Sequence, residues 1–451
     1  MVTAALDEDG NIWSWGPNMS GGLGTNDAVN KSFPGKVVPI GQYSNDRYTP
    51  PGDFIKYITN NRTGGSLKGV SIIINTSSYA WAWGGNSGGW LANNTMAISS
   101  SPISIIGNLQ FMDLAITKAE SGATDPCHIL GLDISSYAWA WGENTHGQLG
   151  DNTTTYMSDA FSFIYTSFNN RSSPVSVVGG KQWIKLLAGN FHSVGLDLSS
   201  YVWCWGDNTY GQLGDGSRTL SSSPVSVLGG IQAIDIAAGL THSVLLSNSS
   251  YVWAWGANTY GQLGINSIVN YSSPVSVIGN QQFKQITSNC ANSIWGLNLS
   301  SYVWSWGNNS NGILGNNVTA NSSSPISVIG NRQFIYVTGS VYSVVALNAS
   351  SYAWSWGNNG YAQLGDYSTV SKSSPVSVVG GYQWSNIDIG SSQIGVQSYP
   401  NSIIVACGSN ADNRMTNYLS YIYNLSSPVA IVTKHSYLRP IPANWKNILG
   451  K

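Results

Sequence analysis

The sequence predicts an all-β protein: a β-propeller of four-stranded blades, built from eight repeats of about 50 residues. The first observation is a Trp-x-Trp-Gly motif that occurs seven times, with a degenerate eighth copy ending at Gly408. The motif glycines lie 68, 58, 64, 50, 51, 50 and 51 residues apart. The second observation is that short runs of alternating apolar and polar residues flank each copy and are separated by turns rich in Gly, Asn and Ser. Four short strands in one such period correspond to one propeller blade.

The fourth repeat shows how each unit is expected to fold. Residues 192–197 and 201–206 alternate around a polar turn and predict a β-hairpin. Residues 207–214 are rich in Gly and Asn and predict a loop. Pro224 stands at the entrance of a third strand, where its missing N–H is tolerated, and residues 233–238 predict a fourth strand.

The tryptophans of the motif are expected to pack between blades. Residues i and i+2 of a strand point to the same face, so Trp203 and Trp205 form one bulky face while Cys204 points the other way. A sheet with one large and one small face stacks densely on a copy of itself. The residues predicted for this interblade role are Trp139, Trp141, Trp203, Trp205, Trp253, Trp255, Trp304, Trp306, Trp354 and Trp356.

The blade count leaves two arrangements open. Eight hairpins and eight pairs of third and fourth strands predict a single propeller domain over residues 1–451, with eight blades or with seven blades and a displaced unit. The chain begins inside a hairpin, and its last predicted strand lies within 445–451. That strand is expected either to complete the first blade or to pair with a neighbouring subunit.

Two insertions interrupt the repeats, at residues 40–56 and 153–171. Loops on a rigid scaffold usually carry specificity, so a partner site is expected here. The second insertion holds the candidate partner-binding residues Tyr156, Phe161, Phe163, Tyr165 and Phe168. Clustered aromatics of this kind favour a protein contact, and the alternative is that the segment folds back on its own blade.

The composition disfavours catalysis and nucleic-acid binding. The chain has 19 Lys and Arg against 20 Asp and Glu, and only 9% of its residues are charged, which leaves little basic surface for phosphates. His128, His192 and His242 share one repeat position, to which Tyr342 is close in another repeat, so a structural role is expected for them. The four cysteines lack zinc-site spacing, and carboxylates do not recur at one repeat position facing the channel. No catalytic residue, cofactor or metal is therefore expected.

Fifteen Asn-x-Ser/Thr sequons occur, and four of them fall at hairpin turns: Asn75, Asn248, Asn298 and Asn348. They are interpreted either as turn-forming residues or as N-glycosylation sites. Glycosylation and the low charge would suit an extracellular, cell-surface or virion-surface protein, with a cytoplasmic location as the alternative. The N-terminus shows no signal-peptide pattern, and no apolar run is long enough for a membrane span.

The repeat resembles that of the regulator-of-chromosome-condensation family. The resemblance covers nearly the whole chain and rests on the His-Ser-x-x-Leu runs at 192–196 and 242–246, on the Trp-Gly pairs, on the Gly-Gln-Leu-Gly loops at 147–150, 211–214 and 261–264, and on loop variants at 312–315 and 362–365. It implies a closed propeller, usually of seven blades. The family's nuclear guanine-nucleotide exchange factor has a basic tail that this chain lacks.

Two functions are expected from these observations. The first is a non-enzymatic structural or adhesive surface protein, such as a filament, cell-surface or virion component, that binds copies of itself and possibly glycans. The alternative is an intracellular adaptor or a regulator of the guanine-nucleotide-exchange type.

Overall fold

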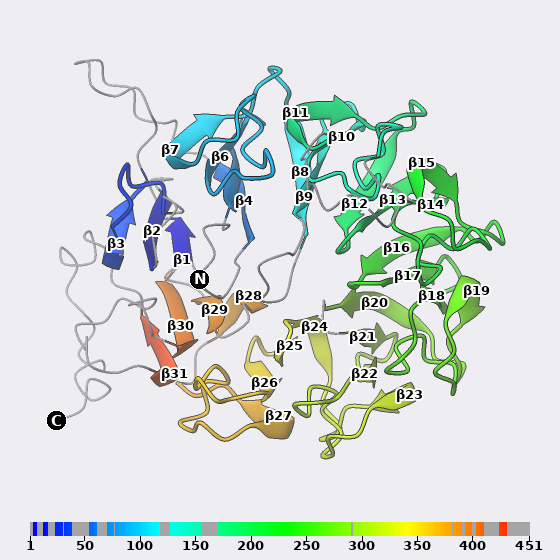
Figure 1. Cartoon of the computed structure of the whole chain (residues 1–451). Coiled ribbons are helices and arrows are strands. Elements are labelled where there is room, and N and C mark those ends of the chain that lie inside the picture. The colour runs from blue at the N-terminus through cyan, green and yellow to red at the C-terminus, as the bar shows by residue number, and fades with distance from the viewer. Residues whose placement is uncertain are drawn as a thin grey trace, which may run out of the picture.

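A computed structural model describes residues 3–6, 12–16, 23–29, 31–37, 54–60, 70–75, 77–117, 127–154, 169–289, 292–380, 383–389, 393–398, 403–409 and 424–430. In this part of the chain the regular structure consists of β-strands in eight antiparallel sheets, which follow one another around a ring (Figure 1). The all-β propeller predicted from the repeats is confirmed, with one sheet for each of the eight repeats.

Seven sheets have four strands and the first has three. The first contains β1 (Thr3–Leu6), β2 (Ile12–Gly16) and β3 (Lys31–Lys36). The next three contain β4 (Phe54–Asn60), β5 (Val70–Asn75), β6 (Ala80–Gly84) and β7 (Ser99–Ser104); β8 (Phe111–Ile116), β9 (His128–Asp133), β10 (Ala138–Gly142) and β11 (Arg171–Ser176); and β12 (Trp183–Ala188), β13 (His192–Asp197), β14 (Val202–Gly206) and β15 (Ser221–Ser226).

The other four sheets contain β16 (Ala233–Ala238), β17 (His242–Ser247), β18 (Val252–Gly256) and β19 (Tyr271–Ser276); β20 (Phe283–Ser288), β21 (Ser293–Asn298), β22 (Val303–Gly307) and β23 (Ser322–Ser327); β24 (Phe334–Gly339), β25 (Ser343–Asn348), β26 (Ala353–Gly357) and β27 (Lys372–Ser377); and β28 (Trp384–Ile389), β29 (Gln393–Ser398), β30 (Ile403–Ser409) and β31 (Asn424–Ala430).

Each blade combines strands from two sequence repeats. The last strand of one repeat becomes the innermost strand of the next blade, as in the sheet order β12-β13-β14-β15. The innermost strands line the inside of the ring and the outermost strands its rim (Figure 1). The two ends of each blade therefore differ. One end, here called the loop face, carries the long loops that follow β10, β14 and their equivalents. The other, here called the hairpin face, carries the tight turns such as the one between β13 and β14.

Neighbouring blades are joined by an apolar layer containing one motif pair of tryptophans. Trp205 is fully buried and Trp203 half-buried, and both pack on the preceding blade, where Leu130 and Ala140 belong to the same cluster. Cys204 points the opposite way, into the cluster shared with the following blade. Fully burying a large aromatic side chain stabilises a fold by a few kcal/mol, so this layer is a main source of propeller stability.

Both insertions end earlier than the sequence suggested. The first was expected to run to residue 56, but β4 already begins at Phe54 because 54–60 pair with β5 as an inner strand. Residues 40–53 lie outside the described residues. The second insertion was expected to include Arg171, but Arg171 is paired with Gly142 and starts β11. The predicted terminal strand 445–451 also lies outside the described residues.

Candidate protein-binding face

The loop face is built from one polar motif that recurs in every complete blade from β4 to β27. In the loop after β14, Asn208 is fully buried, and its Oδ1 accepts a hydrogen bond from the backbone N–H of Leu213 at 3.0 Å. Its Nδ2 donates to the side chains of Asp215 and Ser217 and to the carbonyl of Thr219. The same arrangement surrounds the buried residues Asn86, Asn144, Asn258, Asn309 and Asn359. A buried amide satisfied on both sides fixes the loop in one conformation.

This rigid loop holds an aromatic side chain outward. Tyr210 and Tyr260 are each 40% exposed and Tyr361 is 53% exposed. The backbone N–H of each donates to the side chain of a Gln two residues later, as in the 2.9 Å bond from Tyr210 to Gln212. Asn311 stands at the equivalent place in another loop, so the fold does not require an aromatic there. These three tyrosines, here called the tyrosine row, are available for binding.

His146 has the same repeat position and is less available. Its ring packs on Phe191 with a centroid distance of 4.4 Å. Burial lowers its pKa, against the opposing effect of Asp207. The sequence contained the tyrosine row as the recurring pattern Asn-x-Tyr beside the Gln-Leu-Gly loops, but the expected site was placed in the insertion instead.

The five aromatics of that expected site, Tyr156, Phe161, Phe163, Tyr165 and Phe168, lie outside the described residues. The base of their segment is on the loop face. Arg171 forms an ion pair with Asp151 at 2.6 Å, and the side chain of Asn170 accepts a hydrogen bond from the backbone N–H of Asn144. This base is anchored to the motif loop of its own blade.

The three recurring histidines link blades through hydrogen bonds. His192 Nε2 lies 3.0 Å from Ser243 Oγ of the next blade, and that hydroxyl donates to the carbonyl of Gln212. Because the Ser243 hydroxyl donates its proton to Gln212, its oxygen can only accept a hydrogen bond from His192. The neutral His192 ring therefore carries its proton on Nε2. His128 makes the equivalent contact with Ser193. In the next blade Ile294 stands at the position of Ser243, and His242 Nε2 instead lies 3.0 Å from Ser288 Oγ at the end of the inner strand β20.

Burial sets the charge state of these rings. All three are fully buried, and desolvation lowers the pKa of His128 and His242 to about 3 and that of His192 to about 4. An imidazole that is protonated only in strong acid and has no access to solvent is unsuited to general acid–base catalysis near neutral pH.

The strand register corrects the expected repeat alignment. His192 pairs with Gly206, and the residue that pairs with Gly357 is Ser343, not Tyr342. In this repeat, where Ser343 replaces histidine, Ser340 stands three residues earlier, whereas Gly239 stands three residues before His242. A side chain at Gly239 would overlap the ring of His242, which explains this paired change.

In five of the motifs the second tryptophan also bonds to the preceding blade. Its Nε1 donates to a carbonyl of the motif loop, as from Trp205 to Gln148 at 2.9 Å and from Trp255 to Gln212 at 2.8 Å. The fully buried second tryptophans in the predicted set are Trp141, Trp205, Trp255, Trp306 and Trp356, and the half-buried first ones are Trp139, Trp203, Trp253, Trp304 and Trp354. The loop face is therefore bonded directly to the blade core.

The four sequon asparagines occupy two different positions on the hairpin face. Asn75, Asn298 and Asn348 end a strand, and each Oδ1 accepts the N–H of a tyrosine four residues later. Asp133 and Asp197 make the same bond in sister blades, which fits the interpretation as turn-forming residues. Asn248 lies one position further along, is exposed and contacts Gln232.

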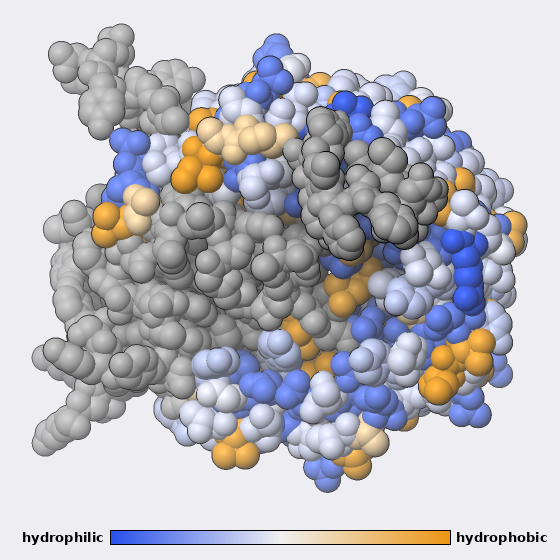
Figure 2. Space-filling model, in the orientation of Figure 1, coloured by the Kyte–Doolittle hydropathy of each residue, from blue (hydrophilic) through white to orange (hydrophobic). Residues whose placement is uncertain are grey.

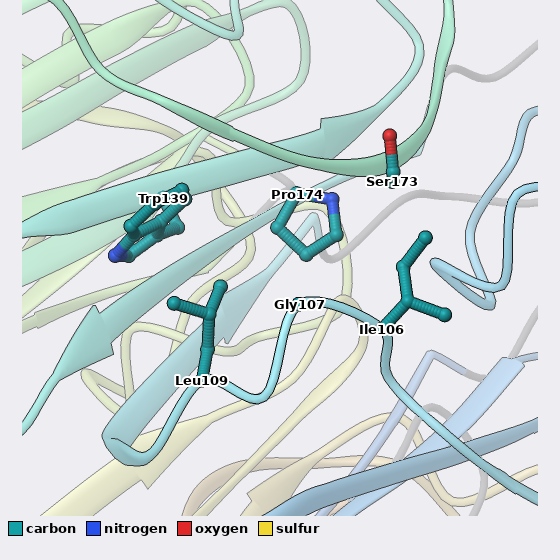
Figure 3. A pocket seen from close by; sticks show the side chains of 6 residues that line it. All are labelled: Ile106, Gly107, Leu109, Trp139, Ser173 and Pro174. Atoms are coloured by element: carbon teal, nitrogen blue, oxygen red, sulfur yellow. The ribbon is translucent and has the colours of Figure 1, made fainter.

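The described residues contain no group of His, Cys, Asp or Glu side chains that could hold a metal ion. They also contain no helix long and apolar enough to cross a bilayer. One open groove of about 180 Å³ lies between Leu109, on the connection from β7 to β8, and the ring of Trp139 (Figure 3). Lys181 and Arg332 occupy the repeat position of Leu109 in other blades and lie over the rings of Trp203 and Trp354. The groove therefore exists because Leu109 is shorter than these side chains and leaves the ring of Trp139 partly uncovered.

Comparisons with known proteins identify the repeat. A family model described as the RCC1-like domain matches residues 1–337. Human E3 ubiquitin-protein ligase HERC2 is 25% identical over 220 residues, which are 49% of this chain and 4% of HERC2. Human alsin is 44% identical over 103 residues, which are 22% of this chain and 5% of alsin. The chain thus matches only a small part of these relatives.

A solved structure shows the same fold. Prp20p from Saccharomyces cerevisiae, described with its binding properties to Gsp1p and histones, superposes with a TM-score of 0.59 at 19% identity. The superposition covers 79% of this chain and 86% of Prp20p.

Proposed function

Because the chain belongs to the RCC1-like domain family, we propose that it is a non-enzymatic protein-binding propeller, an adaptor or an exchange-type regulator, that holds its partner on the loop face. The tyrosine row is the observation that carries the proposal. Tyrosine is enriched at the energetic centres of protein interfaces, and a rigid loop presents it at low entropic cost. The protein partners named for Prp20p support the same class of function.

The architecture of the loop face suits binding better than catalysis. Its carboxylates are used internally: Asp207 bonds to Thr209 and Gln212, and Asp151 is paired with Arg171. On the face in view, apolar side chains form scattered patches among polar ones (Figure 2). Interfaces of non-obligate complexes have this mixed character.

Site-directed photo-crosslinking tests the proposal. A benzophenone amino acid replaces Tyr260 on the loop face, and Tyr251, 38% exposed on the hairpin face, serves as the matched control. We expect a defined protein adduct from position 260 that weakens in Tyr210→Asn/Tyr361→Asn and is absent from position 251. Equal adducts from both positions would contradict the proposal. Release of fluorescent GDP from a small GTPase then separates an exchange regulator from an adaptor.

The competing proposal is a self-assembling structural or adhesive surface protein. The uniform repeats support it, and it predicts oligomers in light scattering. The outer strands disfavour edge-to-edge pairing, because proline stands near the middle of each: Pro34, Pro102, Pro174, Pro224, Pro274, Pro325, Pro375 and Pro428. This feature leads us to prefer the adaptor.

A further inference from the structure

In two blades the first motif tryptophan is hydrogen-bonded to a carboxylate. Asp133 Oδ2 accepts the Nε1 proton of Trp139 at 2.9 Å, and Asp197 Oδ2 accepts that of Trp203 at 2.8 Å. In the other blades from β4 to β27, the residue that caps the same hairpin is neutral: Asn75, Ser247, Asn298 and Asn348. Hydrogen bonds from neutral N–H groups leave the carboxylate charged. Asp133 and Asp197 therefore each place a negative charge at the edge of a ring whose face is itself electron-rich.

Lys181 shows what binds to such a ring. Its Nζ lies 3.5 Å from the centroid of the Trp203 ring, which is the geometry of a cation–π contact. The guanidinium carbon of Arg332 lies at the same distance from the centroid of the Trp354 ring. The chain thus places its own cation on this ring face in two blades, and one of them is a blade that also has the carboxylate.

The ring of Trp139 has the carboxylate but lacks the cation. Leu109 occupies the position of Lys181, and an open groove of about 180 Å³ remains beside the ring (Figure 3). Six residues line this groove, and none of them is basic: Ile106, Gly107, Leu109, Trp139, Ser173 and Pro174. No side chain of the groove lining therefore meets the charge of Asp133.

This combination is specific to the third blade among the described blades from β4 to β27. Ile231 also stands at the position of Lys181 and packs in the same cluster as Trp253, but the hairpin cap there is the neutral Ser247. Of the two rings that carry a carboxylate, Trp203 holds the chain's own lysine. The other ring is left for a cation from outside the chain.

The groove lies on the hairpin face. It is bordered by the connection from β7 to β8, and the backbone N–H of Phe111 at the end of this connection donates to the carbonyl of Ser78. Ser78 belongs to the tight turn between β5 and β6 of the preceding blade. The groove is therefore at the opposite end of the blades from the tyrosine row, and its role is independent of the loop-face proposal.

We propose that the groove at Trp139 binds the side chain of a lysine or arginine that belongs to a protein partner. The charged group lies over the ring as that of Lys181 lies over Trp203, beside the carboxylate. The aliphatic stem of the same side chain lies along Leu109 and Pro174, as the stems of basic residues commonly do on apolar surface.

A peptide selection with an absorption step tests this proposal on the full chain. Random 12-residue peptides displayed on phage are first absorbed on Leu109→Lys, whose own side chain should cover the groove. The unabsorbed phage are then selected on the unaltered chain, so the surviving peptides need the open groove. We expect each of them to contain a Lys or Arg. Replacement of that residue by norleucine, which is uncharged, should weaken binding at least about tenfold in fluorescence anisotropy.

Two further variants place the effect at this groove. Ile231→Lys adds the same charge over Trp253 in another blade and should leave the affinity of the selected peptides within about twofold. Asp133→Asn copies Asn298, so it keeps the hairpin cap but removes the carboxylate, and it should weaken binding about threefold or more. The loop-face variant Tyr210→Asn/Tyr260→Asn should leave the affinity unchanged.

Leu109→Lys should fold, because Lys181 already stands at this repeat position, and its melting temperature checks this. If it proves unfolded, Asp133→Asn takes its place in the absorption step. Four results would overturn the proposal: no surviving peptide, peptides anchored by apolar or acidic side chains, equal affinity of the norleucine peptides, or equal weakening by Ile231→Lys and Asp133→Asn.

Discussion

At the residue scale, the cap of each hairpin decides whether the first motif tryptophan finds an acceptor. Asp197 Oδ1 accepts the turn N–H groups, and its Oδ2 accepts Trp203 Nε1 at 2.8 Å. Asn298 has only one carbonyl oxygen, which Tyr302 uses. Trp304 Nε1 and Trp354 Nε1 are consequently buried without a hydrogen-bond partner among the described residues.

Restoring the second oxygen should stabilise the fold. We expect Asn298→Asp and Asn348→Asp each to raise the free energy of unfolding by about 1 kcal/mol, since a buried indole N–H gains a charged acceptor. Urea denaturation at pH 7 measures the change. Asp197→Asn is the reverse control and should lose a similar amount, and a loss of stability in Asn298→Asp would refute the explanation.

The buried histidines predict acid sensitivity. Their folded pKa values lie near 3 to 4, below the unfolded value of about 6.5, so the folded state excludes a proton that the unfolded chain accepts. The contribution of the neutral histidines to the free energy of unfolding is fully present above about pH 6.5. It falls as the pH drops toward 4, by about 1.4 kcal/mol per pH unit for each histidine. Urea midpoints at pH 7, 6 and 5 measure this slope.

The repeats supply a variant for this test. His242→Ser/Gly239→Ser copies Ser343 and Ser340 and removes one buried imidazole. The double variant should lower the slope of the unfolding free energy against pH by the share of one histidine, about 1.4 kcal/mol per pH unit. His146→Asn should change the slope less, because that ring is partly exposed. An unchanged slope in the double variant would assign the acid sensitivity to other groups.

At the element scale, the loops and blades are held by close backbone contact. Gly211 has a φ of +86°, and a Cβ there would lie 2.5 Å from the Cα of Ser272 in the next blade. Gly230 has a φ of +58° with nothing within 4 Å of the same Cβ. The pair separates the cost of a left-handed backbone from the cost of pushing two blades apart.

Alanine at the two glycines should therefore have unequal effects. Gly230→Ala should destabilise by about 1 kcal/mol, the ordinary cost of a left-handed alanine. Gly211→Ala should destabilise by at least about 3 kcal/mol, because overpacking against backbone is added. Thermal melting of both variants compares them directly, and equal losses would show that the blades can separate without cost.

The sequence predicted these elements to different degrees. The strands and the stacking of Cys204 opposite Trp203 and Trp205 follow from periods of two and about 50 residues, which one chain displays in full. The tyrosine row was visible as a repeated pattern, yet its exposure depends on the buried Asn208 network.

On the inner strand β12, Trp183 pairs with Asp197 and Lys185 with Leu196, so Ile184 is an extra, bulged residue. The bulge was not predicted: it places the buried Trp183 and Leu186 three residues apart instead of two, and the apolar Ile184 between them masks this break in the alternation.

At the scale of the whole molecule, the first sheet is incomplete within the described residues. Strands β1 to β3 lack the inner strand that the other seven sheets have. The predicted strand 445–451 has the Trp-x-x-Ile pattern that also begins the inner strand β28 at 384–387. The connection from β15 to β16 takes six residues, 227–232, whereas fourteen, 431–444, separate Ala430 from this strand.

A linker of that length makes closure within one chain the favoured outcome. A tethered strand competes at an effective concentration near the millimolar range, far above ordinary protein concentrations. We expect the full chain to be monomeric in light scattering and deletion of 445–451 to lower the melting temperature by more than about 5 °C, because a blade loses its inner strand. Deletion of 449–451 is the control and should have little effect. A dimer that becomes monomeric on deletion of 445–451 would instead establish strand exchange between chains, and the propeller would then close only as an assembly.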